Sequence, residues 1–153
     1  MNTTNFPAIL RQCGTDMGFD GLCLDEDNSC TLMIHEAVIT MLWFKATDSL
    51  LLYASLGDVP QGLESELLYK ALLELDMRSR GRLCVSGMDL NTRLVTLGAA
   101  LPGYALTPAS LRGYLDMFGQ EAVAKKKLFT ELLEAHSPWD ESAEPVRDTT
   151  LRI

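Results

Sequence analysis

The chain has 153 residues, of which 47% are hydrophobic, and its formal net charge is −8 at pH 7. This length is sufficient for one domain with its own core, and the apolar content excludes a chain that is disordered throughout. The acidic excess disfavours binding to nucleic-acid phosphates. We expect one domain over residues 1–136 and a polar, flexible tail over residues 137–153, which carries two prolines and lacks periodicity.

The side chains that could bind a metal do not occur in metal-site patterns. They are Cys13, Cys23, Cys30, Cys84, His35 and His136. No two cysteines form a Cys-x-x-Cys pair, and neither histidine lies at a ligand spacing from them, so we expect no zinc site. Because there is no leader pattern and no apolar run of about 18 residues, we expect a cytoplasmic protein with reduced thiols and no membrane insertion.

Residues 4–17 predict a first helix, because their apolar side chains recur on one helical face. These side chains are Phe6, Ile9, Leu10, Cys13 and Met17. Asn5 is a suitable N-cap, and Gly18 a suitable stop. The stripe either covers a sheet or forms part of a groove for a partner.

Residues 22–56 predict an antiparallel meander of three strands, because three short apolar segments are separated by polar turn residues. A sheet with one face in water should alternate apolar with polar residues, but the second and third segments are apolar on both faces. In the second segment, Val38, Leu42 and Phe44 oppose Ile39, Met41 and Trp43. In the third, Leu50, Leu52 and Ala54 oppose Leu51 and Tyr53. The second face therefore requires another element, a second subunit or a bound chain to cover it.

Residues 63–77 predict a second helix that carries two apolar stripes, although an ordinary amphipathic helix has one. The wider stripe contains Leu63, Leu67, Leu68, Ala71, Leu72 and Leu75, and the narrower one contains Tyr69, Leu73 and Met77. We expect the wider stripe to pack on the sheet and the narrower one to contact a partner subunit. The alternative is that a loop or the last helix covers the narrower stripe.

A hairpin is predicted next, with strands at residues 82–89 and 93–98 and a turn between them. Thr107 and Pro108 are a strong start for a final helix that runs to about Ala135. We expect Lys125, Lys126 and Lys127 to form a solvated face of that helix. The fold class is therefore α+β, in the order helix, three-stranded meander, helix, β-hairpin, helix.

No catalytic motif is present, so we expect no catalytic residue and no enzyme. The cluster Asp25-Glu26-Asp27 lacks the ligand spacing of a calcium loop and is typical of an acidic turn. His35 is expected at the surface or in a hydrogen bond near a turn. The alternative of a small enzyme would require a pocket that contains a polar pair, such as His35 with a cysteine. An acidic α/β domain with excess apolar surface is instead typical of a protein-binding module.

Five segments, together with the predicted final helix, carry a resemblance to a known family. They are Met17-Gly-Phe-Asp-Gly-Leu-Cys-Leu-Asp-Glu26, residues 28–32, residues 50–57, residues 68–75 and Gly98-Ala-Ala-Leu-Pro102. In this order and spacing the chain resembles the class I type III secretion chaperones, the Tir-chaperone (CesT-like) family, over roughly residues 4–135. The resemblance implies that the protein uses no cofactor, neither a nucleotide nor a metal.

The resemblance implies a cytoplasmic, secretion-chaperone-like homodimer of a virulence system. Such a dimer binds the N-terminal segment of a secreted effector in extended form and keeps it soluble and secretion-competent. The secretion ATPase or its sorting platform is a further partner that the resemblance allows. The alternative function is that of a regulatory chaperone that sequesters a transcriptional regulator or anti-activator of the secretion system.

The resemblance also suggests which residues carry these functions. The dimer interface would contain Tyr69, Leu73, Met77 and Val85. The effector-binding residues would be Phe6, Leu10, Met17, Met33, Ile39, Met41, Trp43, Leu51 and Tyr53. We expect a charge at Leu73 to disrupt the dimer, and a charge at Met33 or Met41 to weaken client binding without affecting folding.

Overall fold

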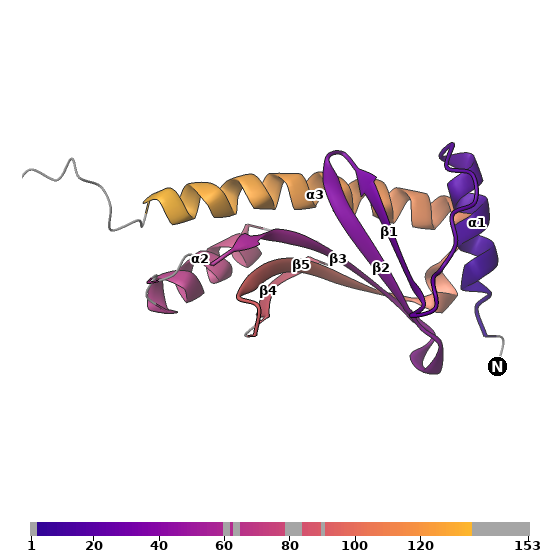
Figure 1. Cartoon of the computed structure of the whole chain (residues 1–153), viewed down its shortest axis with the longest axis horizontal. Helices are drawn as coiled ribbons and strands as arrows, with labels where there is room; N and C mark the ends of the chain where they lie inside the picture. The colour runs from indigo at the N-terminus through magenta and orange to yellow at the C-terminus, as the bar shows by residue number, and fades with distance from the viewer. Residues whose placement is uncertain (1–2, 60–61, 63–64, 79–83, 90, 136–153) are drawn as a thin grey trace, which may run out of the picture.

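The structure is a computed structural model that describes residues 3–59, 62, 65–78, 84–89 and 91–135 (Figure 1). Its elements are α1 (Phe6–Asp16), β1 (Ser29–Ile34), β2 (Ala37–Phe44), β3 (Ser49–Asp58), α2 (Ser65–Met77), β4 (Cys84–Asp89), β5 (Leu94–Pro102) and α3 (Pro108–Ala135). Two short 3-10 helices, Lys45–Thr47 and Gly103–Ala105, follow β2 and β5. The predicted α+β order is confirmed. The prediction of a polar, flexible tail over residues 137–153 lies outside the described residues.

The five strands form one antiparallel sheet in the order β1-β2-β3-β5-β4. The hairpin does not form a separate unit, because β5 pairs with β3 along most of its length. Leu51 lies opposite Ala100, and Tyr53 lies opposite Gly98. Strands β1 and β4 are therefore the two edges of the sheet.

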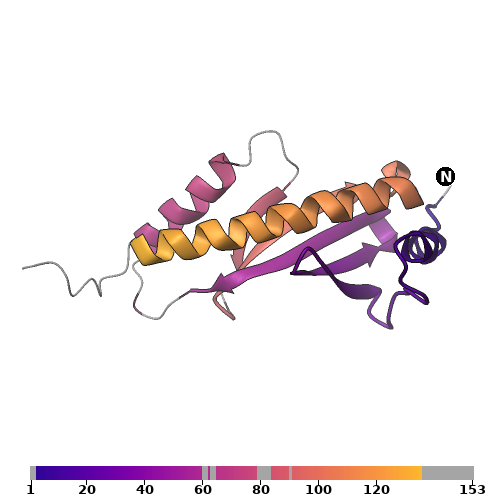
Figure 2. The ribbon, with the colours of Figure 1, turned by 90° about the horizontal axis from the view of Figure 1, so that it is seen from above.

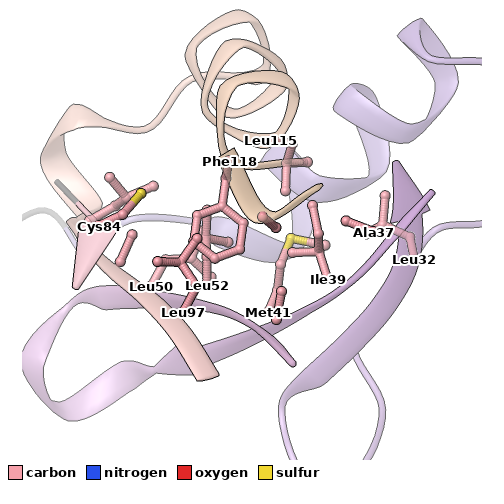
Figure 3. Packing of buried hydrophobic residues seen from close by; sticks show 14 of the residues in the cluster. Leu32, Ala37, Ile39, Met41, Leu50, Leu52, Cys84, Leu97, Leu115 and Phe118 are labelled. Carbon is pink, nitrogen blue, oxygen red and sulfur yellow. The ribbon is translucent and has the colours of Figure 1, made fainter. Parts of the chain in front are cut away.

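Helix α3 packs along one face of this sheet, as Figure 2 shows. Leu111, Leu115, Phe118 and Phe129 are its fully buried apolar side chains. In Figure 3, Leu115 and Phe118 point from the helix onto side chains of the sheet. Those side chains include Ile39, Met41, Leu50, Leu52 and Leu97, which alternate along their strands and are at most 1% exposed. Strand alternation thus places one complete set of apolar residues beneath α3.

The close approach of α3 to the β1–β2 turn depends on Gly119. A side chain there would place its Cβ 3.1 Å from both the carbonyl oxygen and Cγ2 of Ile34. The turn residues His35 and Glu36 both have positive φ angles, of 50° and 68°, which is costly for side chains other than glycine. His35 is hydrogen-bonded to Asp116 of α3, so the helix holds this turn in place.

Helix α1 packs at the end of the sheet near β2 and the start of α3 (Figure 1). The Asn5 side chain accepts a hydrogen bond from the Ala8 amide, as predicted for the N-cap. Phe6 stacks on Trp43 with a distance of 4.7 Å between ring centroids. Leu10 and Cys13 continue the buried stripe, so α1 completes the core instead of leaving its whole apolar face for a partner.

One prediction about α3 is wrong. Lys126 and Lys127 are exposed, but Lys125 is only 3% exposed, and its Nζ has no hydrogen-bond partner among the residues that the structure describes. Burial lowers the pKa of Lys125, and the nearby carboxylates of Glu121 and Asp76 partly oppose this. Three consecutive helical residues span 200° of the circumference, so a run of three lysines cannot share one solvated face when the helix lies in a groove.

Among the described residues, no helix is long and apolar enough to cross a membrane.

Candidate functional site

The sheet has an open face, on the side away from α3, that no described element covers. Its apolar side chains are Met33, Val38, Leu42, Phe44, Leu51, Tyr53, Val85 and Ala100. They lie in rows across the strands: Leu42 is opposite Leu51, which is opposite Ala100, and Tyr53 is opposite Gly98, which is opposite Val85. The excess apolar face that the sequence predicted is therefore present and accessible, and such a surface is typical of a protein-binding site.

The outer edge of β1 borders this open face. The Trp43 amide of β2 donates a hydrogen bond to the Asn28 carbonyl. On the other side of the chain, the Ser29 amide donates to the Asp25 carboxylate, and the Ser29 carbonyl accepts from the Asp25 amide. Alternation then turns the main-chain groups of Thr31 and Met33 away from β2. Among the described strands, β1 pairs only with β2, so these groups form an unpaired edge to which an extended chain can add as a strand.

A second accessible apolar surface lies on α2. Tyr69, Leu73 and Met77 are 56%, 65% and 66% exposed, while Leu68, Ala71 and Leu75 of the same helix are buried. The structure thus separates the two stripes of this helix as predicted: the wide stripe enters the core and the narrow one does not. Val85 of the neighbouring strand β4 is 64% exposed. We call Tyr69, Leu73, Met77 and Val85 the α2–β4 surface.

The structure divides the nine predicted effector-binding residues into two groups. Phe6, Leu10, Ile39, Met41 and Trp43 are buried in the core. Met33 is 65% exposed, and Met17, Leu51 and Tyr53 are partly exposed. Phe6 and Leu10 pack from α1 into the core, and Ile39, Met41 and Trp43 lie on the covered side of β2. Because Met41 is fully buried, we now expect a charge there to disturb folding.

A pocket of about 540 Å³ lies between the end of α1, the end of β1 and the first turns of α3. Its lining includes Met17, Ile34, His35, Arg112, Gly113 and Asp116. His35 Nε2 lies 2.5 Å from Asp116 Oδ1, and the Gln120 side-chain amide donates to Asp116 Oδ2. The hydrogen-bond partner of His35 is thus a carboxylate and not a cysteine.

Sequence reasoning missed Arg112, Gly113 and Asp116 as pocket residues. Arg112, Asp116 and Gln120 are each four residues apart, so their polar groups lie on one stripe of α3. Ala109 and Gly113 have the same spacing. This spacing was the signal that the sequence offered. Only the tertiary structure shows that this stripe lies beside the end of β1.

The Asp25 carboxylate is hydrogen-bonded within its own turn. The Asp25 carboxylate accepts hydrogen bonds from the Asp27 amide, the Ser29 amide and the Ser29 hydroxyl. The Ser29 bonds lower the pKa of Asp25 below its usual value. Within the described ranges, no group of three or more Cys, His, Asp or Glu side chains is arranged to hold a metal ion.

The open sheet face, the unpaired β1 edge and the accessible helix stripe together define a protein-binding module of α+β architecture. The chain belongs to the Tir chaperone protein (CesT) family, whose family model matches residues 8–126. Comparison with curated proteins returned no match.

Solved structures with the same fold include chains from secretion-chaperone complexes. A chain in the ExsC–ExsE complex is 20% identical with a TM-score of 0.64, covering 87% of this chain and 97% of its own length. A chain in the HopA1–SchA chaperone–effector complex is 20% identical with a TM-score of 0.60, and the match covers 82% of this chain and 93% of that one. A third match is a chain in the structure of the Yersinia pestis type III secretion chaperone SycH with a fragment of YscM2. It is 15% identical with a TM-score of 0.58, and the match covers 78% of this chain and 98% of that one.

Proposed function

We propose that this protein is a type III secretion chaperone. It binds the N-terminal segment of a secreted effector in extended form and keeps that segment soluble and secretion-competent. The observation that carries the proposal is the open apolar sheet face beside an unpaired strand edge. Family membership and the chaperone–effector complex among the similar folds support it.

An extended client suits this surface better than a folded one. Main-chain groups of a client strand can bond to Thr31 and Met33 at the β1 edge, and its alternate side chains can then contact apolar residues of the chaperone. Met33, Leu51 and Tyr53 are the predicted effector-binding residues of the open face. A methionine adapts its shape to different partners, which suits a chaperone with more than one possible client sequence.

The proposed working unit is a homodimer whose interface is the α2–β4 surface. Burying a large apolar side chain contributes roughly 1.5–3 kcal/mol, and two-fold symmetry uses each side chain twice. Three large side chains on one exposed helix stripe are therefore a liability for a monomer and a source of affinity for a dimer.

The remaining assignments follow from a binding role. We place the protein in the bacterial cytoplasm, where effectors are made, and assign it no catalytic activity of its own. The secretion ATPase or its sorting platform is a further partner that would receive the loaded chaperone. The tail over residues 137–153 is proposed as a polar, flexible extension outside the folded domain.

The test is capture of the client by the tagged full-length chain from its own bacterium, grown under secretion-permissive conditions. Mass spectrometry identifies the partner, and limited proteolysis of the complex maps the part that the chaperone protects. We expect one partner, protected over a stretch near its N-terminus and digested there once the chaperone is removed.

Two other results would contradict this function. A partner protected as an intact folded domain, with that domain equally resistant when free, favours the regulatory chaperone that sequesters a transcriptional regulator or anti-activator. A captured partner that binds equally well to a variant with charges on the open face, such as Met33→Asp with Tyr53→Asp, shows that the client uses another surface.

A further inference from the structure

The pocket between α1, β1 and α3 has an unusual distribution of polar groups. Its anion, Asp116, already accepts hydrogen bonds on both carboxylate oxygens, from His35 and Gln120. Its cation, Arg112, is exposed and makes no ion pair or hydrogen bond with any residue in the part of the chain that the structure describes. In a chain of net charge −8, an unpaired guanidinium at the rim of a pocket attracts an anionic group.

The pocket also has apolar lining residues. Met17, Ile34 and Ala109 contribute aliphatic side chains, and Gly113 contributes open space, because no atom lies within 4 Å of a Cβ built there. The volume of about 540 Å³ is enough for one large apolar side chain with part of its main chain. The pocket therefore combines room for an apolar side chain with an available positive charge.

The position of the pocket relates it to the strand edge. Ile34 and His35 are the residues at which β1 ends, and the free main-chain groups of Met33 immediately precede them. A chain that adds to the outer edge of β1 therefore passes the pocket, and its side chains on the α3 side point toward it. Along a strand, residues i and i+2 share a face and lie about 6.6 Å apart. One such side chain can fill the pocket while the next on that face reaches its rim.

We infer that this pocket reads a two-residue signature in the client: a large apolar side chain that enters the pocket, and an aspartate or glutamate two positions away whose carboxylate pairs with Arg112. The inference rests on the proposed function, because it assumes an extended client at the β1 edge. It goes further by naming Arg112 as a specificity-determining residue and the carboxylate as the group it selects. The strand direction is not part of the inference, so the acidic residue lies either before or after the apolar one.

A displayed library of random twelve-residue peptides tests the signature without knowledge of the natural client. The full-length chain is used for selection as wild type, Arg112→Glu and Lys126→Glu. Wild type and Lys126→Glu should enrich an apolar residue with Asp or Glu two positions away. Arg112→Glu should enrich Lys or Arg at that second position. Lys126 is exposed on α3, so Lys126→Glu makes the same change in net charge outside the pocket.

One enriched peptide then gives affinities by fluorescence anisotropy. Arg112→Gln should weaken binding about tenfold, the size expected for losing one charge-assisted pair, and Lys126→Gln should leave it within twofold. Gly113→Leu fills the pocket while improving helix propensity, so it should weaken binding at least about tenfold with no loss of Tm. Thr130→Leu, which adds the same side chain at an exposed position of α3 outside the pocket, should bind normally.

The outcomes separate this inference from the function beneath it. If peptides are enriched but Arg112→Glu selects the same acidic position, or if Gly113→Leu binds as well as wild type, the inference is wrong and the binding function stands. If no peptide is enriched over the display scaffold, the proposed recognition of extended segments is contradicted, and the inference fails with it.

Discussion

The Asp76 carboxylate accepts a hydrogen bond from the main-chain amide of Ser86 at 2.8 Å. Asp76 lies in the last turn of α2, and Ser86 lies in the edge strand β4, so the bond attaches the helix to the strand. The neighbours of the bonded residues, Met77 and Val85, both belong to the α2–β4 surface. The two parts of the proposed dimer interface are thus linked within one subunit, and the bond also occupies a donor on the otherwise open edge of β4.

Leu73→Asp should convert the dimer to a monomer. Leu73 is 65% exposed in one subunit, so the change places a carboxylate at the interface without disturbing the core. Two leucines lose their burial per dimer, which predicts a dissociation constant raised at least about a hundredfold. Sedimentation equilibrium measures it, and Lys126→Gln on exposed α3 is the control with the same change in charge. A dimer of unchanged affinity would place the interface elsewhere.

Met33→Asp and Met41→Asp should have opposite consequences. Met33 is on the open face, so its variant should melt at the wild-type Tm and lose client affinity. Met41 is fully buried beneath α3, and an unpaired carboxylate there should cost at least about 4 kcal/mol and prevent folding. Thermal unfolding followed by circular dichroism distinguishes the two. A well-folded Met41→Asp variant would contradict the assignment of the covered face.

Lys125→Met should stabilise the protein at neutral pH, by about 1 kcal/mol, because it removes a buried ammonium that has no hydrogen-bond partner within the described part of the chain. Burial lowers the pKa of Lys125 from 10.5, so just below pH 10.5 the folded chain binds fewer protons than the unfolded chain. The free energy of unfolding of the wild type should therefore rise as the pH increases toward 10.5.

Urea denaturation at pH 7 and pH 10 tests both effects of Lys125. Lys125→Met should lose this contribution to the increase in the free energy of unfolding between pH 7 and pH 10. Lys126→Met, on the exposed side of α3, should keep it. A Lys125→Met variant that is less stable than wild type at pH 7 would show that the ammonium forms a favourable interaction in solution.

Gly113→Ala and Gly119→Ala form a matched pair within α3. The first should raise the free energy of unfolding by about 1 kcal/mol, because its Cβ meets open space and alanine is the better helix former. The second should lower it, since its Cβ would lie 3.1 Å from the carbonyl oxygen of Ile34, and overpacking of this kind costs about 1–3 kcal/mol. Chemical denaturation measures both. Equal stabilisation by the two changes would show that the β1–β2 turn moves freely away from α3.

Some features were accessible from local patterns alone. The alternation of strands β2 and β3, the Asn5 cap and the two stripes of α2 depend on neighbouring residues, and the structure confirms each of them. A period of two or of 3.6 residues is a property of the backbone, so it can be recognised without knowledge of the partner elements.

Other features depended on which element packs against which. Val38 and Ile39 are both β-branched and apolar, and only the position of α3 makes one exposed and the other buried. This is why residues such as Met41 and Trp43 were predicted to bind a client although they belong to the core. The same packing buries Lys125 within a run of three lysines and places Arg112 beside the end of β1. Local sequence thus determined the faces of each helix and strand, whereas long-range packing decided which face meets water, because that choice depends on contacts between segments far apart in the chain.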